Sequence, residues 1–150
     1  MSAIATATTP STTSTVARPS VRGVLAGGTT AAAAGAAGLY VYGAIAQAVG
    51  GKMHAGDPGA DHAVAIPPSA LSFGVVFCTA LGTVLAVILA RRASAPARTF
   101  VRTAVVLTAV SLVPALLASH TDEATRLTLA CGHVLAGVVV IPILGRRLSR

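Results

Sequence analysis

Charged side chains are scarce in this sequence of 150 residues, of which only 10% are Asp, Glu, Lys or Arg. Soluble domains carry about 25% charged residues, whereas here 54% of the residues are hydrophobic. A soluble fold of this length could not remove so much apolar surface from water. The scarcity of charge therefore excludes an ordinary soluble domain and predicts that most of the chain lies in lipid.

Aromatic residues and cysteines are also few. Aromatics make up 3% of the chain, too few to interleave with basic residues as a nucleic-acid surface requires, so the net charge of +7 does not predict nucleic-acid binding. Cys78 and Cys131 stand alone in apolar segments, where we expect small buried hydrophobic residues and no disulfide framework. No Walker loop, GxSxG, HExxH or CxxC motif is present, so we predict no enzyme activity, cofactor or metal site.

What the sequence does contain is four long apolar segments. A membrane-spanning helix needs about 20 apolar residues, and each segment reaches that length. We expect helices at residues 24–49, 69–90, 99–119 and 124–144. The predicted fold is all-α, a four-helix transmembrane bundle over residues 21–147, with a disordered tail at 1–20 and a short tail at 148–150.

The few charges are divided unevenly among the polar stretches. Most basic residues form three clusters: Arg18 and Arg22; Arg91, Arg92, Arg98 and Arg102; Arg146, Arg147 and Arg150. The acids lie in the two other stretches, where only Lys52 and Arg126 are basic. Cytoplasmic flanks carry the excess of Lys and Arg. We therefore predict a multi-pass protein of the cell membrane with both termini in the cytoplasm and its arginines near anionic lipid headgroups.

Local signals mark the helix ends. Pro67-Pro68 predicts the start of the second helix, because the amides of a first turn have no helical partner. Pro96, in the basic turn at residues 91–98, should prevent a continuous helix from the second segment into the third, and Pro114 predicts a kink within the third helix. Thr121 is the expected N-cap of the fourth helix, with two acids in its first turn.

The first segment is rich in Gly and Ala, which let helices approach closely in lipid. Ala31/Gly35 and Ala34/Gly38 are small-xxx-small pairs. They predict either internal packing against the other helices or a face for a homo-oligomer or another membrane-protein partner. Ala46-Gln47-Ala48 leaves a third interpretation open, because it resembles a signal-peptide cleavage site, although the apolar stretch exceeds the usual length of about 7–15 residues.

His133 is a polar residue deep in the fourth segment. It lies roughly 12 Å from the predicted helix start at about 1.5 Å per residue, close to the middle of an about 30 Å hydrocarbon core. An ionisable side chain at that depth is a functional hypothesis. The same depth on the other helices selects Tyr40, Tyr42, Cys78, Thr79 and Ser111 as partners. Such a polar layer would be either interhelical hydrogen bonding that holds the bundle together, or a proton relay or small-ligand pocket.

Carboxylate and imidazole side chains also gather in the two acidic stretches. They are His54, Asp57, Asp61, His62, His120, Asp122 and Glu123. Such groups can bind zinc, but their spacing matches no ligand motif. We predict solvated loops here rather than a metal site.

The last third of the chain carries a pattern that resembles a known family. Ser111 and Pro114 lie in the third segment, and His133 is followed by an apolar run to Ile141-Pro142. This pattern resembles a family of small four-pass membrane proteins of actinobacteria, classed as a domain of unknown function and sometimes labelled as cell-envelope biogenesis proteins. Gly132 departs from it, because members more often carry Met before the His. The resemblance implies a four-helix membrane domain and no particular activity.

The absence of a catalytic constellation predicts a non-enzymatic integral membrane protein that acts through packing or partner contacts in the cell envelope. The alternative is a small transporter or channel subunit with a polar site around His133. A hydrated cavity that reaches His133 would favour the alternative, whereas a closed apolar bundle would favour the first hypothesis.

Overall fold

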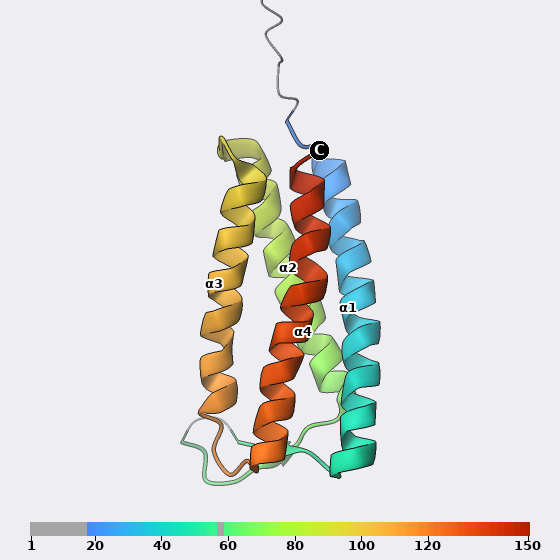
Figure 1. Cartoon of the computed structure of the whole chain (residues 1–150), viewed down its shortest axis with the longest axis vertical. Helices are drawn as coiled ribbons and strands as arrows, with labels where there is room; N and C mark the ends of the chain where they lie inside the picture. Colours follow the sequence, from blue (N-terminus) through green and yellow to red (C-terminus); the bar gives the residue numbers. More distant parts are fainter. Residues whose placement is uncertain (1–17, 57–58) are drawn as a thin grey trace, which may run out of the picture.

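The computed structural model describes residues 18–56 and 59–150 and contains four long helices (Figure 1). Their bounds are α1 Val21–Gly50, α2 Pro68–Arg92, α3 Pro96–Leu116 and α4 Glu123–Leu148. The predicted all-α, four-helix fold is confirmed, and each helix is long and apolar enough to cross a membrane. Most of the tail that we predict to be disordered, residues 1–17, lies outside the described residues.

The helix ends differ from the predicted ones by one to four residues. Helix α3 begins at Pro96 instead of residue 99 and ends at Leu116 instead of 119. Pro96 occupies the first turn, where a proline needs no N–H. Residues 93–95 separate it from α2, so the prediction that the second and third helices are not continuous is confirmed. Helix α4 continues past the predicted end at residue 144, because Leu144 and Leu148 are both buried against the other helices.

The N-cap of α4 is Asp122, so the prediction of Thr121 is wrong by one residue. The Asp122 carboxylate accepts two hydrogen bonds from Thr125, from the backbone N–H at 3.1 Å and from the hydroxyl at 2.6 Å. Thr121 instead donates its hydroxyl to the carbonyl of Ser119 at 2.9 Å. A carboxylate caps first-turn amides, and its negative charge interacts favourably with the helix dipole. These two effects account for Asp122 rather than Thr121 as the N-cap.

The stretch between α1 and α2, predicted as an irregular loop, contains a short antiparallel pair of strands. These are β1 His54–Ala55 and β2 Val64–Ala65. Gly56 then exchanges two backbone hydrogen bonds with Ser119, at 2.9 and 3.1 Å. A Cβ at position 56 would lie only 2.7 Å from the carbonyl oxygen of His62, so glycine permits this approach. The two loops at this end of the bundle are thereby joined.

Helix α1 packs most extensively against α2 and next against α4, while α4 also packs against α3. The stripe of α1 that is buried in these contacts consists of Val24, Gly27, Gly28, Ala31, Gly35, Leu39 and Gly43. A Cβ at Gly43 would lie 3.3 Å from Cα of Pro68 in α2, so the two helices are in close contact. The pair Ala31/Gly35 therefore packs inside the chain, whereas Ala34 and Gly38 are exposed.

The sides of the bundle are apolar. Large hydrophobic side chains are exposed on every helix, for example Val41 on α1, Phe73 on α2, Leu107 on α3 and Val138 on α4. In water such a surface would drive association, but lipid tails are as apolar as a protein core. The exposed side chains are therefore those expected of a helical bundle that lies in a bilayer.

The antiparallel arrangement brings all three basic clusters to one end of the bundle. The starts of α1 and α3 and the ends of α2 and α4 lie together there (Figure 1); we call this the arginine end. Asp61, Asp122 and Glu123 lie at the opposite end, with the two loops. We call it the acidic end. The charges that are scattered along the sequence are thus gathered at two poles.

Candidate functional site

Tyr42 links two helices through its hydroxyl group. Its Oη donates a hydrogen bond to the carbonyl oxygen of Thr128 at 3.0 Å, and this bond joins α1 to α4. The acceptor is a backbone atom and therefore could not be found by a search for polar side chains. Of the six residues in the predicted polar layer, Tyr42 has an interhelical hydrogen bond of the kind expected to hold a membrane bundle together.

His133 and Ser111 bond to their own helices. Nδ1 of His133 lies 2.8 Å from the carbonyl oxygen of Leu129, and the hydroxyl of Ser111 donates to the carbonyl of Thr108 at 2.7 Å. A carbonyl oxygen can only accept, so Nδ1 of His133 carries a proton. Both side chains thus donate to a backbone carbonyl about one turn back in the same helix.

Tyr40 and Cys78 face outward from the bundle. Tyr40 is 53% exposed, and Cys78 is exposed as well. Cys131 is also exposed, so the prediction that the two cysteines are buried is wrong. In lipid, outward-facing positions accept the same small apolar residues as the core, and an apolar sequence around a cysteine does not reveal which way it faces.

Thr79 is buried, with 1% of its surface exposed, and its Oγ1 has no hydrogen-bond partner among the described residues. Gly82, almost one turn further along α2, lies opposite Leu144, because a Cβ there would be 3.9 Å from Cδ1 of that leucine. Leu144 lies roughly 16 Å beyond His133 along α4 at about 1.5 Å per residue. Thr79 and His133 are therefore at different levels of the bundle.

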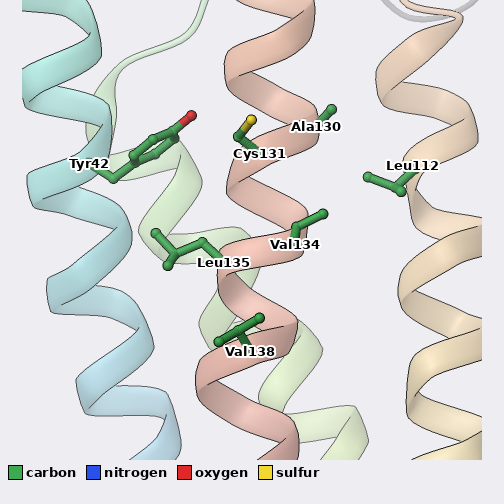
Figure 2. A pocket seen from close by; sticks show the side chains of 7 residues that line it. All are labelled: Tyr42, Leu112, Ala130, Cys131, Val134, Leu135 and Val138. Atoms are coloured by element: carbon green, nitrogen blue, oxygen red, sulfur yellow. The ribbon is translucent and has the colours of Figure 1, made fainter.

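A shallow groove runs over the outward face of α4, between α1 and α3 (Figure 2). Its volume is about 540 Å³, and it is lined by Tyr42, Leu112, Ala130, Cys131, Val134, Leu135 and Val138. Tyr42 and Leu135 lie between α1 and α4, and Leu112 points from α3 toward α4. The lining is almost entirely apolar. We call it the main groove; it includes Tyr42 but none of the five other residues of the predicted polar layer.

A smaller recess of about 240 Å³ lies between α3 and α4 at the acidic end. It is lined by Leu116, Glu123, Arg126 and Leu127, and we call it the end recess. The guanidinium of Arg126 donates to the carbonyl of Ala118 at 3.4 Å. The Nε atom of Arg126 is buried and has no hydrogen-bond partner in the described part of the chain. In the sequence, Arg126 stands out only as an exception to the charge pattern, and that pattern does not place it in a site.

The sequence matches the family of unknown function DUF6069 over residues 18–150, which include all four helices and both recesses. The chain belongs to this family. No curated protein and no solved structure matches it. The expected membership in a family of unknown function is confirmed. Because the description of DUF6069 names no activity, the function of this member has to be argued from its own residues.

The acidic end of this DUF6069 protein carries Asp122 and Glu123 side by side at the start of α4. Hydrogen bonds from Thr125 lower the pKa of the Asp122 carboxyl, because they stabilise its charged form. No three His, Cys, Asp or Glu side chains gather as metal ligands would within residues 18–56 and 59–150. Asp57, one of the seven residues considered as metal ligands, lies outside these ranges.

Proposed function

We propose that the chain is a non-enzymatic, multi-pass protein of the cell membrane that acts through contacts between its helices and partners in the bilayer. The observation that carries this proposal is the division of its surface, which is apolar along the sides and charged at the two ends. A protein of this kind offers its partners lateral surfaces. An enzyme or transporter would need convergent polar groups inside the bundle, and in the predicted layer the His133 and Ser111 side chains bond to their own helices.

The proposed orientation places the arginine end in the cytoplasm. Three clusters of arginine lie at this end, and the acids lie at the other. Positive charge is retained on the cytoplasmic side of membrane proteins, and anionic headgroups attract it there. Both termini of the helical domain would then be cytoplasmic, and the strand pair would face outward.

Reporter fusions test the orientation, and fractionation tests the membrane assignment. A reporter that is active only in the cytoplasm should give a signal after Arg150 and in the turn at residues 93–95. A reporter active only outside should give a signal in the loop at residues 59–60. An external signal after Arg150 would overturn the orientation. Recovery of the chain in the soluble fraction without detergent would overturn the membrane assignment itself.

The exposed side of α1 is the proposed surface for a second copy or another membrane protein. Ala34 and Gly38 are exposed there, and a Cβ at Gly38 would meet no atom within 4 Å. Small residues on a free face let a second helix approach closely. The other small pair of α1 already packs inside the chain, so of the two pairs Ala34/Gly38 is the one that a partner can reach.

A matched pair of variants tests this surface. Gly38→Leu should weaken association measured by energy transfer between labelled copies, or the yield of a co-purified partner. Gly74→Leu is the control, because Gly74 is an exposed glycine of α2 that also has open space around it. Equal association in the two variants and the wild type would remove α1 as the contact surface.

The structure gives less support to a transporter or channel subunit organised around His133. The Nδ1 proton of His133 is bonded to Leu129 of the same helix, and His133 lines neither the main groove nor the end recess. A proton relay would need a second polar group or water within reach of the ring. We therefore favour the contact function.

A further inference from the structure

The main groove and the end recess follow one another along the outward side of α4. Leu112 of the main groove and Leu116 of the end recess are one turn apart on α3. Ala130 of the main groove and Leu127 of the end recess are likewise about one turn apart on α4. Residues a turn apart share a helix face. We treat the two recesses together as the seam groove, which starts at the acidic end and runs toward the middle of the bundle.

The seam groove is as long as one leaflet of a bilayer is deep. From Leu127 to Val138 the helix rises roughly 17 Å at about 1.5 Å per residue. Half of the hydrocarbon core measures about 15 Å. An occupant that enters at the acidic end therefore reaches the bilayer midplane where the groove ends.

From Gly137 onward, at the inner end of the seam groove and toward the arginine end, α3 and α4 are in close contact. A Cβ at Gly137 would lie 3.2 Å from Cγ2 of Thr108, and a Cβ at Gly145 would lie 3.3 Å from Cγ2 of Val101. These contacts close the space between the two helices in the half of the bundle toward the arginine end. A partner helix that crosses the whole membrane would find a groove only in the half of the bundle toward the acidic end. A lipid acyl chain occupies a single leaflet and therefore matches the length of the groove.

The mouth of the seam groove carries one charge of each sign. Arg126 and Glu123 both line the end recess, and both lie in the first turn of α4. The proposed placement of the bundle in the membrane puts this turn where headgroups meet the hydrocarbon core. Among residues 18–56 and 59–150, the buried Nε–H of Arg126 has no partner, and the guanidinium donates to the backbone carbonyl of Ala118. Glu123 is exposed. The third charge nearby, Asp122, already accepts hydrogen bonds from Thr125.

We propose that the seam groove binds one aminophospholipid, with an acyl chain along Leu127 to Val138, its phosphate at Arg126 and its ammonium group near Glu123. A guanidinium forms strong charge-assisted hydrogen bonds with phosphate oxygens, and a carboxylate attracts the ammonium. A lipid whose headgroup has no amine leaves the Glu123 carboxylate without a positive partner. The proposal deepens the contact function proposed above and rests on it, because it requires the acidic end to lie at a headgroup surface.

The test uses the full chain, purified in detergent and exchanged into bilayer discs. The discs contain equal amounts of phosphatidylethanolamine and phosphatidylglycerol with identical acyl chains, and native mass spectrometry reads the lipid that stays bound. We expect one phosphatidylethanolamine per chain. Arg126→Gln should lower its retention about tenfold, the loss expected for one charge-assisted bond. Glu123→Gln should shift the preference toward phosphatidylglycerol. Arg98→Gln, at the arginine end, is the control and should change neither.

A second pair of variants tests the apolar part of the seam groove. Val134→Trp places an indole in the main groove and should displace the lipid. Val84→Trp places the same side chain on the exposed surface of α2 and should not displace the lipid. It is a matched control because both valines are about half exposed, whereas Val134 lines the groove and Val84 does not. Thermal unfolding of each variant shows that it is folded. If Val134→Trp fails to fold, the two headgroup variants alone decide the matter.

Three results would overturn the proposal. Equal retention of both lipids, unaffected by Arg126→Gln, would leave an apolar groove with no headgroup selection. Preference of the wild type for phosphatidylglycerol would assign the mouth to an anionic lipid. A protein bound in place of lipid would make the groove a helix-docking surface. These three results are interpreted only if the chain fractionates with membranes. Recovery of the chain in the soluble fraction would instead show that the membrane assignment itself is wrong.

Discussion

Replacing Gly28 with alanine would place a methyl group in the closest contact between α1 and α2. A Cβ at this position would collide with the hydroxyl of Thr83 and lie 2.7 Å from its Cγ2 and 3.0 Å from its Cβ. Thr83 is buried and donates its hydroxyl to the carbonyl of Thr79 at 2.7 Å. A β-branched side chain has few rotamers in a helix, so Thr83 cannot turn away and the helices must separate.

The expected cost follows from two opposing effects. Alanine is better than glycine in a helix by about 1 kcal/mol, whereas a forced methyl group in a packed interior costs about 1–3 kcal/mol. Gly38→Ala supplies the first effect alone, because open space surrounds Gly38. The difference in the free energy of unfolding between Gly28→Ala and Gly38→Ala therefore isolates the steric cost, and we expect it to be about 1–3 kcal/mol.

The assay is unfolding in detergent micelles, followed by circular dichroism during a titration with a denaturing detergent. Combining Gly28→Ala with Thr83→Ala should recover part of the loss, with a coupling free energy of at least about 0.5 kcal/mol, because the two residues touch. If Gly28→Ala is as stable as Gly38→Ala, or if the double variant is merely additive, the close contact between α1 and α2 is refuted.

Three further predictions concern single side chains. Asp122→Ala should lower the unfolding temperature by removing the N-cap. In the wild type the pKa of Asp122 is lowered, so the stabilisation is present above about pH 3.8 and is lost as the pH falls through the pKa of the folded state. The variant should lack this loss of stability in acid. Tyr42→Phe should cost about 0.6 kcal/mol in the same unfolding assay, while Tyr40→Phe, at an exposed position, should cost nothing; equal effects would place the α1–α4 hydrogen bond in doubt. His133→Leu should leave membrane insertion intact by fractionation and change stability by less than about 1 kcal/mol, and a pH-dependent cellular phenotype that it abolished would revive the relay hypothesis.

Hydropathy predicted the number of helices because each apolar segment has to satisfy its backbone internally in lipid. It could not predict which way a side chain points around a helix. Tyr40 and Tyr42 were placed in one layer by depth, yet Tyr40 faces outward and Tyr42 bonds to the carbonyl of Thr128. In a soluble helix a polar stripe would reveal the direction, but a helix in lipid is apolar on both its inner and outer sides.

The end recess was beyond sequence analysis for a different reason. Arg126 stood out because it lies among acids, but its meaning depends on Leu116 of another helix and on the carbonyl of Ala118. The strand pair was missed because two residues in each strand are too few to show alternation. Gly56 and Ser119 are 63 positions apart in the chain, and no local sequence pattern predicts the hydrogen bonds between them.

The two backbone hydrogen bonds between Gly56 and Ser119 connect the two helical hairpins of the molecule. One loop belongs to the hairpin of α1 and α2, and the other to the hairpin of α3 and α4. Because these hydrogen bonds fix the two hairpins to each other at the acidic end, a rotation of one hairpin against the other displaces the arginine end most. A partner that binds the arginine end would therefore produce the largest relative movement of the two hairpins.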